Sequence, residues 1–344
     1  MSAFLNLLIG VFGFAISAGL TRRFCDPASR LHILDHPNER SLHTQPTPRS
    51  GGIAILSAVC VGTLWLAWRF QDTSRLPWIA AGMLLIAAVS FVDDRRRLPV
   101  VERMLAHLLG AALLLWRGFA LHGLVLGSAV LYFPGWTGIV LSLLFVVWMV
   151  NLYNFMDGMD GFAGGMALIG FGAFAILGWM AGNGLFFATS MLVAAAAAGF
   201  LVYNFPPARI FMGDTGSSTL GFLVAALTLW GVRDGIFRFG TALLVFSPFV
   251  VDATVTLLRR LLQGERIWQA HRSHYYQRLV QLGWSHRKTV LWEYGLMLAC
   301  VASAVWASSR ARAVEGRVLI VWGVLYVSLM VFVHVFERRA RQSA

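Results

Sequence analysis

Charged side chains are scarce in this chain of 344 residues: Asp, Glu, Lys and Arg together make up 13% of it. Soluble domains carry about 25% charged residues, and here 58% of the residues are hydrophobic. So few polar groups cannot cover the surface of a soluble globule. The composition therefore excludes that class and indicates a membrane protein.

Cysteine is also rare. The three cysteines, Cys25, Cys60 and Cys300, are far apart and have no metal-ligand spacing, which excludes a disulfide framework. Acidic residues are few as well, 16 against 28 Lys and Arg, which gives a net charge of +12. The basic residues lie between apolar blocks and not on one polar face, so we expect them to orient the chain and meet anionic lipid. We expect no nucleic-acid partner.

Long apolar runs fill most of the chain. A membrane helix needs about 20 mostly apolar residues. Eleven stretches qualify as spans: 2–20, 52–70, 77–92, 103–118, 138–156, 162–181, 185–204, 216–232, 239–258, 290–308 and 317–336. The stretch 119–137 alternates apolar with small residues and predicts a short surface hairpin. The sequence therefore predicts an all-α polytopic bundle in one membrane domain, residues 1–344.

The distribution of positive charge predicts the orientation of this bundle. Eleven spans put the termini on opposite sides. With the N-terminus outside, twenty Lys and Arg face the cytoplasm and eight face outward, which the positive-inside rule favours. The loops expected in the cytoplasm are 21–51, 93–102, 157–161, 205–215 and 259–289.

Two adjacent carboxylates end the third span, in FVDDRRRLP. Asp93 and Asp94 repel each other unless a cation or nearby arginines neutralise them. This pattern is typical of a site that binds a cation. It is equally typical of a solvated span end paired with the arginines at 95–97, and both interpretations stay open.

The segment NLYNFMDGMDG, residues 151–161, carries polar side chains at the end of the fifth span. Asn151, Asn154 and Asp157 are spaced i, i+3, i+6, near one helix face, and Asp160 follows. Carboxylates and amides beside small residues suit a hydrated divalent ion or a nucleotide. A polar helix end closed by a glycine turn is the weaker alternative.

The segment YNFPPARIFMGDTGSS, residues 203–218, leads into the eighth span. A Gly/Ser/Thr-rich turn at a helix N-terminus offers N–H groups and a favourable dipole to phosphate. Asp214 beside it is placed to hold Mg²⁺ on a diphosphate. Taken alone, this motif more often means an ordinary N-cap by Asp214, Thr215 or Ser217.

Two further loops carry basic groups. The loop 259–289 contains HRSHYYQR, whose His271, Arg272 and His274 are candidates to grip a pyrophosphate or a sugar. The alternative there is an amphipathic helix at the lipid interface. The first loop, DHPNERSLHTQPTPRSGG, brings Arg40 and His43 to the same face, or is a solvated connector.

One carboxylate lies inside a span. Asp252, in SPFVVDATVTLLRR, is a functional candidate because intramembrane carboxylates are costly. The alternative is a structural ion pair with Arg259, seven residues later on the same helix face.

Five of these stretches, taken in order, resemble the polyprenyl-phosphate N-acetylhexosamine-1-phosphate transferases. That family includes the enzyme that starts O-antigen synthesis and, as a relative, the muramoyl-pentapeptide translocase. The stretches are DHPNERSLHTQPTPRSGG, FVDDRRRLP, NLYNFMDGMDGFAGG, NFPPARIFMGDTGS and HRSHYYQRL, between residues 35 and 279. Eleven spans fit the O-antigen branch better than the ten-span translocase branch.

The resemblance implies a helical bundle in the bacterial inner membrane, with a periplasmic N-terminus and a cytoplasmic active site. It implies transfer of a sugar-1-phosphate from a UDP-N-acetyl sugar to undecaprenyl or another polyprenyl phosphate, with release of UMP. The implied cofactor is Mg²⁺, with Mn²⁺ as an alternative, and the implied product starts O-antigen, lipopolysaccharide or a related polysaccharide. We also consider a homodimer.

The resemblance also implies roles for the matched residues. Asp214 and Asp94 are the expected metal ligands. The expected catalytic groups are Asp93, Asp94, Asn154 and Asp157. The expected substrate-binding groups are Asn151, Asp160, Asn204, Phe211 beneath the uracil, Arg40, His43, His271, Arg272 and His274.

The last motif departs from the family. Where HRDHLHHRL is common, this chain has HRSHYYQRL, so Ser273, Tyr276 and Gln277 replace an Asp and two His. This suggests a 6-deoxy sugar, N-acetylfucosamine or N-acetylquinovosamine, instead of N-acetylglucosamine. The rival hypotheses are a membrane transporter and a non-catalytic polysaccharide-assembly protein.

Overall fold

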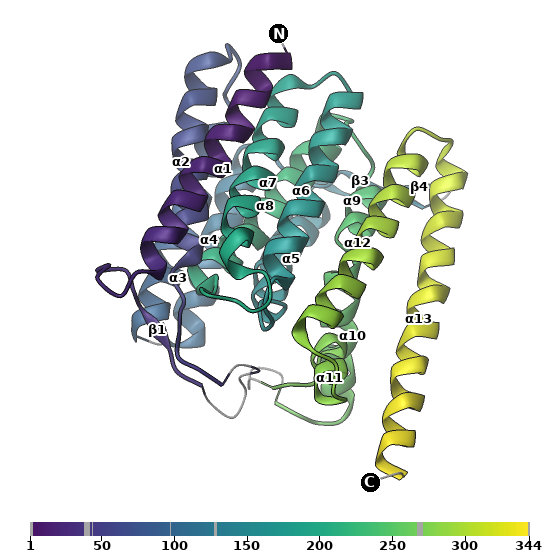
Figure 1. Cartoon of the computed structure of the whole chain (residues 1–344). Helices are drawn as coiled ribbons and strands as arrows, with labels where there is room; N and C mark the ends of the chain where they lie inside the picture. Colours follow the sequence, from purple (N-terminus) through teal and green to yellow (C-terminus); the bar gives the residue numbers. More distant parts are fainter. Residues whose placement is uncertain are drawn as a thin grey trace.

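A computed structural model describes residues 3–37, 42, 44–96, 98–126, 129–266 and 271–342. It shows a helical bundle with two small strand pairs (Figure 1). Over those residues, nine helices are long and apolar enough to cross a membrane, or ten if one bent pair counts as a span. The predicted all-α membrane architecture is confirmed.

The helices follow the predicted spans closely. They are α1 (Ala3–Cys25), α2 (Gly51–Arg69), α3 (Leu76–Arg96), α4 (Val100–Trp116), α5 (Gly135–Phe155), α6 (Phe162–Met180), α7 (Gly184–Asn204), α8 (Gly213–Arg233), α9 (Phe239–Val245), α10 (Ser247–Leu262), α11 (Tyr275–Gln281), α12 (His286–Ser308) and α13 (Arg312–Gln342). The termini lie at opposite ends of the bundle (Figure 1). Helix α4, with 17 residues, is the shortest unbroken counterpart of a predicted span.

The strands are short. Strands β1 (Leu34–Asp35) and β2 (Thr47–Pro48) pair antiparallel within the first loop. Strands β3 (Gly123–Leu126) and β4 (Ala129–Tyr132) also pair antiparallel, between α4 and α5. The second pair confirms the hairpin predicted for 119–137.

The ninth predicted span, 239–258, is not one straight helix. It divides into α9 and α10, which meet at an angle of 83°. Pro248 lies in the first turn of α10, where its missing N–H costs nothing because that group has no helical partner. The chain therefore enters the bundle as a short helix and leaves it in a new direction.

Helix α8 lies at the centre of the bundle. In its most apolar stretch 94% of the residues are buried, against 17% for α13 at the edge. Small residues let α8 approach its neighbours closely, as is usual between membrane helices. A Cβ on Gly52 of α2 would lie 2.3 Å from the Cα of Gly216 in α8. The first turn of α8 thus packs directly against α2.

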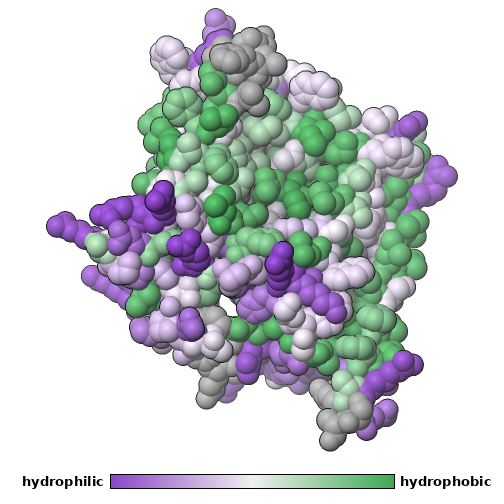
Figure 2. Space-filling model, viewed as in Figure 1, coloured by the Kyte–Doolittle hydropathy of each residue, from purple (hydrophilic) through white to green (hydrophobic). Residues whose placement is uncertain are grey.

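The loops predicted to be cytoplasmic lie at one end of the bundle. The lower end in Figure 1 holds β1 and α11, and Asp94 at the end of α3 contacts the start of α8. In the space-filling view, hydrophilic side chains gather around the lower end of α1, below a largely hydrophobic surface (Figure 2). This end carries the candidate site.

Candidate functional site

The start of α8 is held by a carboxylate from another helix. Asp94, in the last turn of α3, accepts hydrogen bonds from the N–H of Asp214 (3.1 Å) and from the N–H and hydroxyl of Thr215 (3.0 and 2.7 Å). The first N–H groups of a helix have no partner within it, and a carboxylate satisfies them. The N-cap position is Met212, which makes no capping bond. The alternative of a local N-cap by Asp214, Thr215 or Ser217 is therefore wrong.

Gly213 shapes the turn that presents these N–H groups. Its φ of +74° lies in the left-handed region that favours glycine. A Cβ there would lie 2.4 Å from the carbonyl oxygen of Arg49. The Arg49 guanidinium donates a hydrogen bond to the backbone carbonyl of Asp94 and lies 3.6 Å from Asp35. The first loop thus closes over the start of α8.

The Asp214 side chain is oriented from α5. Asn154 Nδ2 donates hydrogen bonds to Asp214 Oδ1 (2.9 Å) and to Ser217 Oγ (3.0 Å). Ser217 donates in turn to the carbonyl of Gly213 at 3.1 Å. One amide therefore orients the Asp214 and Ser217 side chains at the start of α8, and the catalytic role of Asn154 stays a prediction.

Asp93 faces the same region from α3. Its carboxylate accepts from the N–H of Leu98 (2.6 Å) and lies 3.2 Å from Arg103 Nη1. It is also close enough to Asp214 to interact with that carboxylate directly. Arg103 is not among the residues predicted for the site. Arg103 lies in the first turn of α4, and the short connection from α3 indicated that this turn lies close to Asp93.

Asp157 completes an acidic cluster, defined here as Asp93, Asp94, Asp157 and Asp214. Burial, and then the charges of Asp214 and Asp94, raise the pKa of Asp157 well above its usual range. The four carboxylates come from α3, the α5–α6 loop and α8. The predicted convergence of Asp93, Asp157 and Asp214 on one site is thus present in the structure.

The acidic cluster has donor chemistry that suits a hard divalent cation. Over the described ranges, no three His, Cys, Asp or Glu side chains are arranged as a complete metal cage. Mg²⁺ commonly binds one or two carboxylates and takes its other oxygens from water and substrate phosphates. Of the cluster, Asp214 is held by Asn154 through one oxygen, whereas both Asp94 oxygens already bind the α8 start.

Asn204 and Asp160 join two loops beside the cluster. Asn204, which is buried, accepts from the N–H of Gly161 (3.0 Å) and donates to the carbonyl of Ile210 (2.8 Å). Asp160 accepts from the N–H of Ala208 at 3.0 Å. It also lies 3.3 Å from His286 Nδ1. Both side chains bind backbone groups, so they fix the conformation of the loops beside the acidic cluster.

Asn151 contacts α4, whereas Asn154 contacts α8. Its Nδ2 donates to the carbonyl of Val147 (2.7 Å) and lies 3.2 Å from His107 Nδ1 on α4. Each step of three residues falls about 60° short of a full helical turn, so Asn151 and Asn154 differ by about 60° on α5, and Asp157 lies beyond its end. The residues of the i, i+3, i+6 pattern therefore contact two different helices, α4 and α8.

Three predicted binding residues lie in the first loop or contact it: Arg40 and His43 belong to the loop, and Phe211 contacts it. Phe211 is held by backbone hydrogen bonds, donating to Pro48 O (2.6 Å) and accepting from Gly51 N (3.0 Å), and its ring is partly exposed. Arg40 and His43 lie outside the described residues. Their predicted roles, and that of Phe211 beneath the uracil, stay predictions.

Asp252 holds the start of α11. It accepts from the N–H groups of Tyr275 (3.0 Å) and Tyr276 (3.2 Å) and from the hydroxyl of Thr256 (3.0 Å). It also lies 3.2 Å from His274 Nδ1. Arg259 instead donates to the Ser273 carbonyl and lies over the Tyr275 ring. Asp252 is thus a cap for α11.

The histidine motif divides into neutral and charged groups. Burial, followed by the charges of His274 and Arg260, lowers the pKa of His271 to about 4, so this ring is neutral near pH 7. His274 is buried against Asp252. Arg272 is exposed. Of the three predicted residues, Arg272 is the cation available to an anionic substrate.

Helix α11 is also tied to the last span. Arg278 Nε donates to Glu337 Oε1 of α13 at 2.6 Å, and its guanidinium lies 4.6 Å from the centre of the Tyr275 ring. On its other side, the Tyr276 hydroxyl donates to the carbonyl of Phe155 at 3.4 Å. The histidine motif is therefore fixed between α13 and the acidic cluster.

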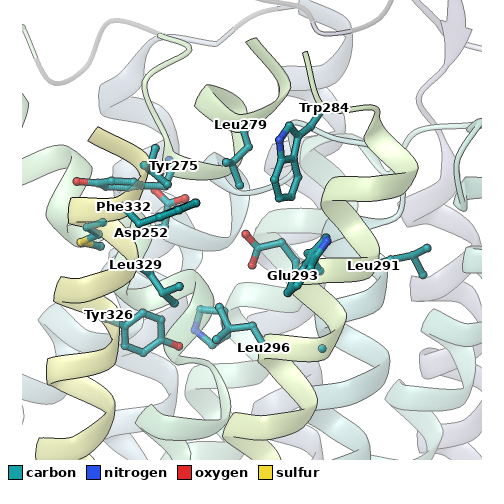
Figure 3. A pocket seen from close by; sticks show the side chains of 15 residues that line it. Asp252, Tyr275, Leu279, Trp284, Leu291, Glu293, Leu296, Tyr326, Leu329 and Phe332 are labelled. Carbon is teal, nitrogen blue, oxygen red and sulfur yellow. Dashed lines mark hydrogen bonds between the residues drawn. The ribbon is translucent and has the colours of Figure 1, made fainter. Parts of the chain in front are cut away.

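An apolar groove opens beside α11. It has a volume of about 920 Å³ and lies between α10, α12 and α13. Figure 3 shows Trp284 at the α11 side of the groove and Tyr326 deeper along it, with the Glu293 carboxylate between them. Asp252 lines the groove where it meets α11. The groove is large enough for part of a lipid chain.

The fold and the site define a polytopic membrane enzyme whose carboxylates gather at one end of the bundle. The model of glycosyl transferase family 4 matches residues 76–232. A probable undecaprenyl-phosphate N-acetylglucosaminyl 1-phosphate transferase of Bacillus subtilis is 32% identical over 77% of this chain and 74% of its own length. The chain belongs to glycosyl transferase family 4.

Two further relatives extend this similarity. The decaprenyl-phosphate N-acetylglucosaminephosphotransferase of Mycobacterium tuberculosis is 31% identical over 83% of this chain and 79% of its own length. A phospho-N-acetylmuramoyl-pentapeptide-transferase of Geobacillus kaustophilus is 32% identical over 74% of this chain and 82% of its own length. The predicted family is confirmed.

Proposed function

We propose that this enzyme transfers an N-acetylhexosamine-1-phosphate from a UDP-sugar to undecaprenyl phosphate or a similar polyprenyl phosphate, with release of UMP. The names of the relatives from Bacillus subtilis and Mycobacterium tuberculosis support this reaction type. The observation that carries it is the convergence of Asp93, Asp94, Asp157 and Asp214 at one end of the bundle.

The proposed site faces the cytoplasm of a bacterium, in its inner membrane. The excess of Lys and Arg on the loops at this end supports the orientation, because positive loops stay inside. UDP-sugars are water-soluble, whereas the acceptor keeps its chain in the bilayer. The product would start O-antigen, lipopolysaccharide or a related surface polysaccharide.

Asp214 is the proposed protein ligand for Mg²⁺, or for Mn²⁺ in its place. Asn154 orients its carboxylate through one oxygen. Mg²⁺, when bound, would neutralise charge on the donor diphosphate and on the leaving UMP. The hydrogen bonds of Asp94 to the α8 start favour a role in positioning Asp214. Metal ligation by Asp94 stays a prediction.

The proposed reaction is a direct displacement. An oxygen of the polyprenyl phosphate forms a bond to the β-phosphorus of the UDP-sugar, and the bond from that phosphorus to UMP breaks. The second pKa of a phosphate monoester is about 6, so the acceptor is mostly dianionic at neutral pH and needs no strong base. Asp93 would position it or remove a residual proton, and no covalent intermediate on Asp157 is required.

The apolar groove of Figure 3 is the proposed path for the polyprenyl chain. It is lined mainly by apolar side chains of α12 and α13 and reaches Asp252 below α11. Tyr276, between Asp252 and the α5–α6 loop, links this region to the acidic cluster. A lipid in the groove would thus keep its chain in the bilayer while its phosphate approaches the carboxylates.

The proposed sugar is N-acetylfucosamine or N-acetylquinovosamine. The support is the altered motif HRSHYYQRL. In this chain the Tyr276 hydroxyl donates to the Phe155 carbonyl and Gln277 Oε1 accepts from the His274 N–H, and both side chains are buried away from a sugar 6-hydroxyl. A site built without such a partner is compatible with a 6-deoxy sugar.

The test uses the purified full chain with undecaprenyl phosphate and a panel of UDP-N-acetyl sugars. We expect Mg²⁺-dependent release of UMP together with a lipid diphosphate sugar, fastest with a 6-deoxy sugar. Faster turnover of UDP-N-acetylglucosamine would overturn the sugar assignment alone. Accumulation of a labelled solute in proteoliposomes without UMP release would identify a transporter instead.

A further inference from the structure

A polar hollow lies at the loop end of α1, apart from the acidic cluster. It has a volume of about 530 Å³ and is lined by the last turns of α1, the turn that follows and Arg209. Arg209 belongs to the α7–α8 loop, far away in sequence. The hollow is therefore formed by two segments that the fold brings together.

The hollow carries unbalanced positive charge. Arg22, Arg23 and Arg209 line it together with a single acidic residue, Asp26. Asp26 lies 3.1 Å from Arg23 Nη1 and so neutralises that arginine. Over the described part of the chain, Arg22 and Arg209 form no ion pair with a carboxylate. Two guanidinium groups thus remain to bind an anion.

The helix dipole explains only part of this arrangement. Arg22 and Arg23 occupy the last turn of α1, where cations are favourable. Arg209 is in a loop and is not at a helix C-terminus. Its backbone is nevertheless fixed, because its N–H donates to the Tyr203 carbonyl at 2.8 Å. Its guanidinium lies 5.7 Å from the centre of the Tyr203 ring. The third arginine is therefore held in position beside the α1 pair.

An apolar surface adjoins the hollow. Helix α1 packs against α7, and both present large apolar side chains outward: Phe12 is 64% exposed, Phe14 41% and Val202 58%. Phe14 precedes Arg22 by eight residues, or about 12 Å along a helix. An occupant that complements both parts has an anionic head and hydrocarbon chains.

We propose that this hollow binds the phosphate of an anionic phospholipid headgroup, whose acyl chains lie along α1 and α7. Basic pockets between membrane helices are suited to such headgroups, and arginine forks match phosphate oxygens. The ligand is a lipid of the surrounding bilayer and is distinct from the acceptor lipid of the proposed reaction.

Binding at the hollow would also act on the donor site. Arg209 lies between Ala208, whose N–H binds Asp160, and Ile210, whose carbonyl binds Asn204. Holding the Arg209 side chain would steady these two contacts. This consequence rests on the proposed function, whereas lipid binding itself does not.

The binding test uses the full chain and native mass spectrometry, with phosphatidylglycerol, phosphatidylcholine and inorganic phosphate as probes. The variant Arg22→Ala/Arg209→Ala is compared with Arg30→Ala/Arg287→Ala, which removes the same charge from exposed arginines outside the hollow. We expect phosphatidylglycerol to bind the first variant about 30-fold more weakly than wild type. The control variant should bind it like wild type.

Three results would overturn the proposal: equal phosphatidylglycerol binding by wild type and Arg22→Ala/Arg209→Ala, an equal loss in the control, or displacement of the lipid by millimolar inorganic phosphate. Arg22→Ala alone serves if the double variant does not fold, because Arg22 is exposed. In nanodiscs, phosphatidylglycerol should lower the KM for the UDP-sugar in wild type and in the control, but not in Arg22→Ala/Arg209→Ala. An inactive wild type that still binds the lipid would contradict the proposed function and leave this site standing.

Discussion

Asp94 and Asp252 do the same structural work in two regions with opposite electrostatics. Each accepts hydrogen bonds from two backbone N–H groups at a helix start and from one threonine hydroxyl. Asp252 then has His274 beside it, whereas Asp94 has Asp93, Asp157 and Asp214 nearby. A carboxylate that caps a helix is structural in both places. The surplus negative charge around Asp94 is what points to a cation and a reaction.

Of the variants that test this comparison, Asp214→Asn should have the largest effect on activity. Removing the charge of the proposed metal ligand should lower Mg²⁺-dependent UMP release by about 100-fold or more. Assays across a Mg²⁺ titration would measure it. Asp72→Asn, an exposed carboxylate in the α2–α3 loop, is the control and should leave the rate unchanged. Full turnover by Asp214→Asn would remove the metal assignment.

Asp94→Ala and Asp252→Ala should separate stability from activity. Each leaves helix N–H groups and a buried hydroxyl without an acceptor, which should cost about 1–3 kcal/mol of stability. Thermal unfolding in detergent should show similar losses. Only Asp94→Ala should also weaken the apparent Mg²⁺ affinity, because it moves Asp214. The same shift in Asp252→Ala would show that the two regions are not electrostatically independent.

Asp157 predicts how the metal-free protein responds to pH. Its folded-state pKa is raised, above the ordinary value of about 3.9, so the neutral form favours folding. Its contribution to stability is fully present below that ordinary value and is lost as pH rises through the folded pKa. In EDTA, wild type should therefore unfold at a higher temperature at pH 5 than at pH 8.

Asp157→Asn should flatten that pH dependence and should raise the unfolding temperature at pH 8 in EDTA. With Mg²⁺ present the gain should shrink, because the cation would already relieve the repulsion. If the unfolding temperature of Asp157→Asn depended on pH as in wild type, the charge of Asp157 would not be what destabilises the metal-free protein at high pH.

The smallest effect is expected at His274. His274→Gln keeps a hydrogen-bonding side chain next to Asp252 and should change the stability by about 1 kcal/mol or less. The Mg²⁺ dependence of UMP release should stay as in wild type. A variant that lost turnover at every Mg²⁺ concentration would place His274 in direct contact with substrate.

Local sequence predicted the helices well and the contacts between them poorly. The apolar runs are helical, the ninth as two helices, because backbone in lipid requires internal hydrogen bonds. The bend before Pro248 was missed because hydropathy averaged over 20 residues carries no direction. The true cap of α8 was missed because Asp94 lies 119 residues before Gly213 in the chain.

The same limit applies to individual site residues. Asn154 was placed correctly beside Asp214, but Asn151 turned to α4, which spacing along one helix cannot reveal. The pairing of Arg103 with Asp93 depends on the turn between α3 and α4. Motif order predicted which segments meet. Only the fold shows which atoms they share.

The bend between α9 and α10 bears on how a lipid would reach the site from the bilayer. A straight helix would wall off that side of the bundle over its full height. The 83° bend between α9 and α10 instead leaves the groove open beside α12 and α13. In the proposed reaction, the acceptor lipid would bring its phosphate to the loops through this opening while its chain stays in the hydrocarbon layer.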